Sequence, residues 1–153
     1  MRCYIPAARA DLSAVELTAR TVHAVTPALR GYYPKADLES LEHVATLMAA
    51  DESLPRLAAG EARRIVCVAE VADADLVLPA APARDAAEIT GVTLTAAVPW
   101  HKVESILVDA PGSEELVRRA IAGEQQAFEQ CGDIDLLWFD VTERALLVSE
   151  LEN

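Results

Sequence analysis

The chain has 153 residues, of which 25 are acidic and 13 are basic, so its formal net charge at pH 7 is −12. This acidity argues against binding of nucleic acid or of anionic membranes, because both kinds of partner need a basic face. Hydrophobic residues make up 52% of the composition. Together with the length, this fraction predicts one folded domain over residues 1–153 and excludes a disordered chain.

The first half of the chain predicts two strands and two helices. Strands are expected at residues 2–6 and 21–25, with a short helix at residues 12–17 between them. Asp37 then opens a longer helix, in which apolar residues recur at helical spacing. Pro55 is expected to break or kink this helix, because proline lacks the N–H that the helix needs.

Three further strands are expected in the middle of the chain. Residues 63–71 include a run that is apolar on both faces, which predicts a central strand, whereas residues 89–98 contain the alternation of a strand with one wet face. Residues 104–108 form the third strand. Residues 73–88 carry two prolines and many alanines with little periodicity, which predicts a mobile excursion or lid.

The last third predicts a helix followed by an ambiguous segment. Ser113 caps the helix, which is expected to end at Cys131. For residues 135–151 we expect a strand at 136–139 and a helix from Thr142, with one continuous helix as the alternative. These elements predict an α+β fold, with a mixed sheet of about five strands and helices packed mainly on one face.

Residues 22–34, with the sequence V-H-A-V-T-P-A-L-R-G-Y-Y-P, gather most of the polar aromatic residues. A strand meets a short helix here. Thr26 can cap that helix, Pro27 suits its first position and Gly31 can end it. The backbone N–H groups at such a helix start can hold an anion.

This turn is where we expect a small ligand to bind, if the protein binds one. The candidate ligand-binding residues are Thr26, Arg30, Tyr33 and His23. The Arg30 guanidinium would add a charged donor to the N–H groups of the helix. In the alternative interpretation the turn is purely structural, and Arg30 pairs with an acidic neighbour such as Glu39 or Glu42.

No sequence motif of a known catalytic chemistry is present. The chain has no G-x-S-x-G, P-loop or G-x-G-x-x-G sequence, and its histidines lack metal-binding spacing. We therefore expect no metal and no cofactor, and we assign no catalytic residue. The three cysteines, Cys3, Cys67 and Cys131, are far apart without a C-x-x-C pair, which predicts neither a disulfide framework nor a zinc site.

Large aromatic residues are few, so each tryptophan is expected either in the core or at an interface. Trp138 lies among apolar residues and is predicted to be in the core. Trp100 stands beside His101 and Lys102, so we expect it to be partly exposed and regard it as the candidate interface residue.

Four segments, M-R-C-Y-I-P-A, H-A-V-T-P-A-L-R, R-R-I-V-C-V-A-E-V and L-L-W-F-D-V-T-E, occur in this order. The chain thereby resembles DUF6912, a family of small actinobacterial proteins of unknown function. The resemblance covers nearly the whole chain, and A-V-T-P-A-L-R is its most specific part. It implies an actinobacterial, cytoplasmic origin, and it carries over no catalytic residue.

The start of the chain lacks the long apolar stretch of a signal peptide, so a cytoplasmic protein is expected. We expect a non-catalytic domain that acts through protein contacts as a homodimer, with an unknown protein partner also compatible. The reason is that its apolar content exceeds what a small single-layered domain can cover. The alternative is a small-molecule or anion-binding protein, or an enzyme, with its site at the Thr26 turn.

Overall fold

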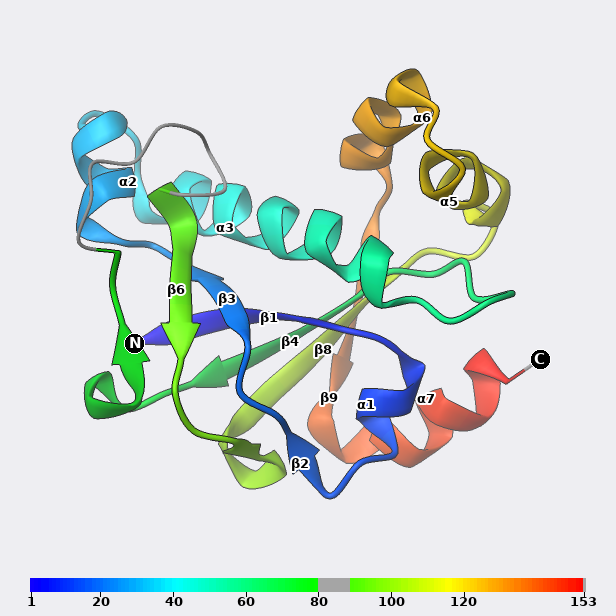
Figure 1. The fold of residues 1–153 in the computed structure, drawn as a ribbon, viewed down its shortest axis with the longest axis horizontal. Coiled ribbons are helices and arrows are strands. Elements are labelled where there is room, and N and C mark those ends of the chain that lie inside the picture. Colours follow the sequence, from blue (N-terminus) through cyan, green and yellow to red (C-terminus); the bar gives the residue numbers. More distant parts are fainter. Residues whose placement is uncertain (80–88, 153) are drawn as a thin grey trace.

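The computed structural model describes residues 1–79 and 89–152 (Figure 1). Its strands are β1 (Arg2–Ala7), β2 (Glu16–Leu17), β3 (Thr21–Ala24), β4 (Ile65–Glu70), β5 (Leu76–Val77), β6 (Gly91–Leu94), β7 (Val98–Pro99), β8 (Val103–Asp109) and β9 (Leu136–Asp140). Its α-helices are α1 (Arg9–Leu12), α2 (Pro27–Tyr32), α3 (Leu38–Ser53), α5 (Glu114–Ile121), α6 (Gln125–Gln130) and α7 (Arg144–Leu151). Short 3₁₀ turns are η1 (Leu54–Arg56), η2 (Asp73–Asp75), η3 (Trp100–Lys102), η4 (Cys131–Asp133) and η5 (Val141–Glu143).

The fold is α+β, as predicted, and is built on one large sheet. In the described residues this sheet has seven strands in the order β5-β6-β3-β1-β4-β8-β9, and each neighbouring pair is antiparallel. β2 and β7 pair separately. The sheet is larger than the expected five strands and is not mixed, because the order of pairing depends on contacts between distant segments.

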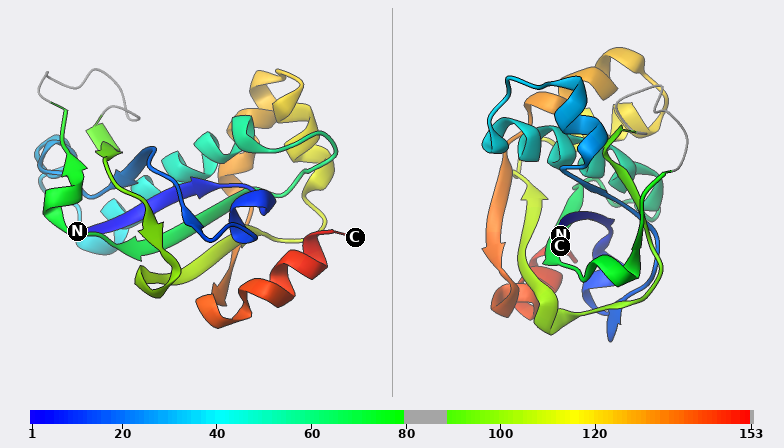
Figure 2. Two further views of the ribbon diagram at one scale, coloured as in Figure 1. Left: turned by 60° about the horizontal axis from the view of Figure 1, so that its bottom comes forward. Right: turned by 90° about the vertical axis from the view of Figure 1, so that its left-hand side faces the viewer.

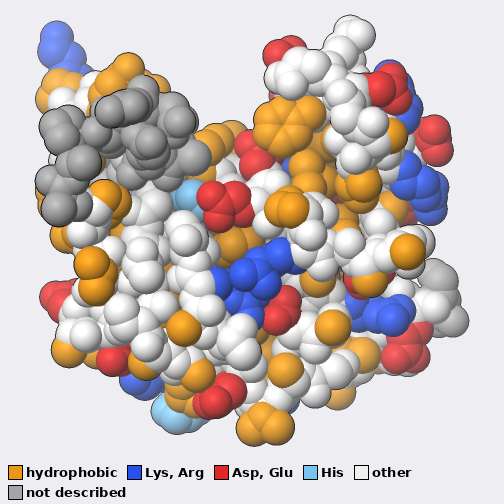
Figure 3. Space-filling model, viewed as in Figure 1, with side chains coloured by type: hydrophobic (Ala, Val, Ile, Leu, Met, Phe, Trp, Pro, Cys, Tyr) orange, Lys and Arg blue, Asp and Glu red, His pale blue; other side chains and the backbone are white. Residues whose placement is uncertain are grey.

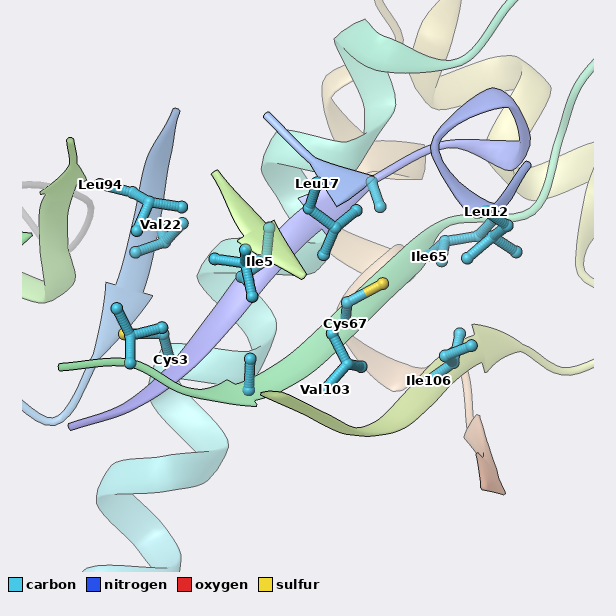
Figure 4. Packing of buried hydrophobic residues seen from close by; sticks show 14 of the residues in the cluster. Cys3, Ile5, Leu12, Leu17, Val22, Ile65, Cys67, Leu94, Val103 and Ile106 are labelled. Carbon is cyan, nitrogen blue, oxygen red and sulfur yellow. The ribbon is translucent and has the colours of Figure 1, made fainter. Parts of the chain in front are cut away.

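One face of the sheet holds the larger core. Ile5, Cys67 and Ile106 from three adjacent strands lie in it near Leu12 of α1 (Figure 4), and Leu147 of α7 belongs to the same cluster. All five side chains are buried completely or nearly so. The leucines therefore place α1 and α7 against this face.

The opposite face packs against α3. Val66 and Val68 of β4 contact Ala45 and Ala49, whose small side chains let the helix lie close to the strand. Because neighbouring residues of a strand face opposite sides, β4 is buried on both faces, which confirms the predicted central strand. Figure 2 shows α3 and α7 on opposite sides of the sheet.

Two early predictions were wrong in position. The helix expected at residues 12–17 is replaced by α1, which ends at Leu12, and by β2, which forms because it pairs with the distant β7. Gly31 does not end α2, which continues to Tyr32.

The single helix predicted from Ser113 is in fact two helices, α5 and α6. Gly123 lies between them with φ of 99°, a conformation that favours glycine. Ser113 holds the N-cap position, but its hydroxyl donates to the carbonyl of Ala110 at 2.7 Å. The strand expected at residues 89–98 is likewise divided, into β6 and β7, because its end leaves the main sheet to pair with β2.

The predicted strand followed by a helix at the carboxyl end is confirmed. β9 pairs with β8, with Leu107 opposite Trp138, and α7 follows η5. Asp140 ends the strand and starts the turn, because its carboxylate accepts the N–H of Thr142 at 2.9 Å.

The segment 73–88, expected to be an excursion, contributes η2 and β5 to the fold, and β5 pairs with β6. Residues 80–88 lie outside the described residues, so their expected mobility stays a prediction. In the part of the chain that is described, no helix combines the length and the apolar character needed to cross a lipid bilayer.

Candidate functional site

The turn at Thr26 forms as predicted, and the Thr26 hydroxyl makes hydrogen bonds to other parts of the chain. This hydroxyl accepts the N–H of Leu29 at 3.1 Å as the cap of α2, and it donates to the carbonyl of Ile89. Thr26 is also almost fully buried. Its donor and acceptor capacity therefore serves to fasten α2 to the chain at Ile89.

His23 of β3 is fully buried and links three segments. Its Nδ1 lies 2.7 Å from Oγ1 of Thr90, and its Nε2 lies 3.0 Å from the carboxylate Oε2 of Glu52 on α3. The contact with Glu52 is not aligned as a hydrogen bond, so within the described ranges Nε2 has no hydrogen-bond partner. The histidine thus joins the sheet to the end of α3.

Thr90, His23 and Glu52 are residue types that also occur in hydrolytic triads, but here the order in which they are exposed to solvent is reversed. In a triad the hydroxyl faces the substrate and the carboxylate lies behind the histidine. Here Thr90 and His23 are fully buried, whereas 38% of the Glu52 side chain is exposed. The geometry therefore offers a surface carboxylate with a histidine behind it, and no accessible nucleophile.

A buried ion pair joins the start of β4 to the end of β8. Arg64 donates from Nε to Oδ2 of Asp109 at 2.9 Å and from Nη2 to Oδ1 at 3.0 Å, and both residues are fully buried. Nη2 also donates to the carbonyl of Cys131 at 2.8 Å. The pair therefore fastens the end of the α5–α6 hairpin to the sheet.

Arg20 is a second buried cation, and its partners are equally well defined. It donates to Oδ1 of Asp11 and to the carbonyl of Pro6, each at 2.9 Å. Arg56 lies close to it, and partial burial together with the charge of Arg20 lowers the pKa of Arg56.

No motif singled out these buried arginines or Asp109 in the sequence. For Arg64 one signal was present: it lies two residues before Val66, so the period of a strand places both on the same covered face.

The structure does not bring the four predicted ligand-binding residues into one site. Arg30 is exposed and lines a hollow with Arg2, Tyr4 and Glu42, on which neither His23 nor Thr26 borders. Tyr33 is about half exposed, and its ring meets that of Tyr32 edge to face at 5.1 Å. Among the described residues Arg30 has no ion-pair partner, so the expected pairing with Glu39 or Glu42 is absent; Glu42 pairs with Arg2 instead.

Of the two tryptophans, Trp100 has the exposure predicted from the sequence and Trp138 does not. Trp100 is partly exposed, as expected; its Nε1 donates to the carbonyl of Ala14 at 2.9 Å, and the Arg144 guanidinium lies 4.3 Å from its ring centre. The interface role of Trp100 stays a prediction. Trp138, predicted to be in the core, is 63% exposed, because its strand forms the edge of the sheet.

β9 therefore forms an open, apolar edge. It pairs with β8 on one side, and Figure 2 shows it as the outermost strand on that side of the sheet. Alternate backbone N–H and C=O groups of an edge strand point away from the sheet. Besides Trp138, Leu137 is also exposed. We call this strand with its two exposed side chains the β9 edge.

Neither an exposed thiol nor a cluster of metal ligands occurs in the part of the chain that the structure describes. Cys3, Cys67 and Cys131 are buried and free, and burial raises the pKa of the Cys67 thiol to about 12. Within residues 1–79 and 89–152, no three His, Cys, Asp or Glu side chains are grouped as metal ligands. Figure 3 shows a face on which acidic, basic and apolar side chains are intermixed.

Comparison with known proteins gives a family and no activity. No curated protein and no solved structure matches the chain significantly. A family model described as a family of unknown function, DUF6912, matches residues 1–148. Because this match spans almost the entire length, the chain belongs to the DUF6912 family, whose function is unknown.

Proposed function

We propose that the protein is a non-catalytic interaction domain that acts as a homodimer, and that the β9 edge forms the dimer interface. The observation that carries the proposal is the exposure of Trp138 on an edge strand. Proteins commonly protect such edges with lysine, proline or a covering segment. The sequence of β9, L-L-W-F-D, contains neither lysine nor proline.

The edge is complementary to a second copy of itself. Two antiparallel copies related by a two-fold axis at Trp138 would place this side chain opposite its own symmetry mate, and Leu137 opposite Phe139. The backbone groups that point outward would then pair, and the main sheet would continue from one protomer into the next.

The charge of the strand does not oppose this pairing. Asp140 is the charged residue of β9, and its carboxylate accepts hydrogen bonds from the backbone N–H and the hydroxyl of Thr142 at 2.9 and 2.6 Å. It is therefore held by its own chain. The exposed part of the edge is left to apolar side chains, which favour association by burial.

Sedimentation equilibrium tests the interface. We expect the wild-type protein to sediment as a dimer at micromolar concentration, and Trp138→Lys to sediment as a monomer, because lysine on an edge strand opposes pairing. Val77→Lys is the matched control, since Val77 is 55% exposed on β5 at the other edge of the sheet. It should remain dimeric.

A cysteine cross-link tests the register. Residues that face each other in an antiparallel pair have Cα atoms roughly 4.5–5.5 Å apart, within the range that a disulfide can span. Trp138→Cys should therefore give a covalent dimer on mild oxidation, whereas Val77→Cys should not. The native cysteines are buried and do not compete. A monomeric wild-type protein, or a Trp138→Lys variant that stays dimeric, would refute the proposal.

A further inference from the structure

A hollow of about 290 Å³ lies where the first strand meets α2 and α3. Its polar walls are Arg2 and Tyr4 of β1, Arg30 of α2 and Glu42 of α3. The volume falls just below the range of about 300–1,000 Å³ that is typical of pockets for drug-sized ligands. The hollow therefore suits a small molecule.

The acidic group in the hollow is already neutralised. Glu42 accepts the Tyr4 hydroxyl at 2.7 Å, and its carboxylate lies 3.5 Å from Nε of Arg2. Burial, followed by the hydrogen bond to Glu42 and by its charge, raises the pKa of Tyr4, so this hydroxyl remains protonated and continues to donate. A cation entering the hollow would have to compete with these partners.

The guanidinium of Arg30 lines the hollow without an ion-pair partner among the described residues. The chain has 25 acidic residues and 13 basic ones, yet Arg30 makes no ion pair within the described residues. Arg2 also lies within 4.0 Å of Glu104, so its charge is shared between two carboxylates. Within the residues that the structure describes, the Arg30 guanidinium is thus a planar donor without an ion-pair partner, which matches the geometry of a carboxylate.

The remaining walls include apolar side chains. Val25 follows β3 and is partly buried, and Leu38 at the start of α3 is 52% exposed. An exposed leucine beside an unpaired arginine offers a contact for the apolar part of a ligand, and covering it would be favourable.

We propose that this hollow binds a small organic carboxylate, whose anionic group pairs with Arg30 and whose apolar part lies on Val25 and Leu38. The inference uses neither the start of α2 nor the β9 edge, so it is independent of dimer formation. Inorganic phosphate is the alternative ligand for Arg30. Because phosphate lacks an apolar part, it would make no contact with Val25 and Leu38.

A titration with sodium hexanoate, monitored by two-dimensional NMR, tests the proposal. We expect hexanoate to shift the methyl resonances of Val25 and Leu38 and the side-chain N–H resonance of Arg30. Acetate and inorganic phosphate should bind more weakly, because neither covers the apolar wall. Equal affinity for phosphate and hexanoate would overturn the assignment to an organic carboxylate.

Two variants separate the charge from the apolar wall. Arg30→Gln should weaken hexanoate binding by at least about tenfold, the scale of one charge-assisted hydrogen bond. Leu38→Ser should weaken the binding of hexanoate but not that of acetate. Arg118→Gln, which removes an exposed arginine from α5, is the control and should bind as the wild type does.

Arg30 and Leu38 are exposed, so both variants should keep the wild-type melting temperature, which is measured alongside. Hexanoate that shifts none of the three residues, or that binds Arg30→Gln and wild type equally, would overturn the proposal.

Discussion

Arg64 and Asp109 carry buried charges that compensate each other where β4 begins and β8 ends. Removing one charge of such a pair leaves the other unpaired in a medium that solvates it poorly. We expect Asp109→Asn to lower the free energy of unfolding by about 3–5 kcal/mol, measured by urea denaturation.

The exposed pair of Arg119 and Glu124, 3.1 Å apart, provides the control for this prediction. Glu124→Gln should leave the free energy of unfolding nearly unchanged, because water and salt screen exposed charges. If both variants lost a similar free energy of unfolding, burial would not be the reason that the Arg64–Asp109 pair stabilises the fold.

The buried Cys67 thiol should make the free energy of unfolding decrease at alkaline pH. Burial raises the pKa of its thiol from 9.0 to about 12 in the folded state, so above pH 9 the unfolded chain loses a proton that the folded chain keeps. The free energy of unfolding should therefore fall as the pH rises above 9, by about 1.4 kcal/mol per pH unit from this group. Below pH 9 the contribution is complete.

Urea denaturation at several pH values checks this slope. Cys67→Ala removes the thiol, so its free energy of unfolding should decline less steeply above pH 9 than that of the wild type. Parallel declines in the two proteins would contradict the assignment to Cys67.

At the scale of elements, α3 is fixed at both ends by side chains. The Asp37 carboxylate accepts the N–H of Ser40 at 2.9 Å and caps the first turn. At the last turn, the buried Ser53 hydroxyl donates to the carbonyl of Ala7 at 2.7 Å and accepts the N–H of Ile65 at 3.0 Å. The helix is thus fastened to β1 and β4, which holds Glu52 beside His23.

Two glycines in helical regions should respond oppositely to alanine. Gly123 separates α5 from α6 with φ of 99°, whereas Gly31 lies inside α2, and an added Cβ would meet nothing within 4 Å at either position. Gly123→Ala should destabilise the protein by about 1 kcal/mol or more, because L residues are strained at positive φ. Gly31→Ala should stabilise it by about 0.5–1 kcal/mol, because alanine favours a helix.

Thermal unfolding of both variants measures the difference directly. A stable Gly123→Ala protein would indicate that α5 and α6 can join as the single helix that the sequence pattern predicts.

At the scale of the whole molecule, the net charge of −12 opposes self-association at low salt, whereas the proposed interface at the β9 edge would favour it. We expect the melting temperature of the wild type to rise with protein concentration, because only the folded chain can dimerise. Added salt should strengthen the effect by screening the repulsion. Calorimetry over a range of concentrations measures both.

Trp138→Lys should remove the concentration dependence and leave a single melting temperature. The proposed interface would be wrong if this variant and the wild type responded equally to concentration.

Much of the local structure followed from the sequence. The cap at Thr26, the helix that starts after Asp37 and its end before Pro55 were all predicted, because caps and helix breakers act over a few residues. The apolar run within residues 63–71 predicted its own burial, because only a central strand is covered on both faces.

The candidate sites depend on contacts between distant segments, and only the tertiary structure decided them. Trp138 lies in an apolar run that fits a core strand, and it is exposed because the sheet ends at β9. The Arg30 side chain was expected to join a ligand site with Thr26 and His23, and it borders instead a hollow lined by residues of β1 and α3 and by Val25. The sequence by itself determined most strands and helices, since these follow from residues close along the chain, whereas β2 forms only because it pairs with the distant β7. Which strand lies at the edge, and which side chains meet, depends on packing between residues far apart in the sequence.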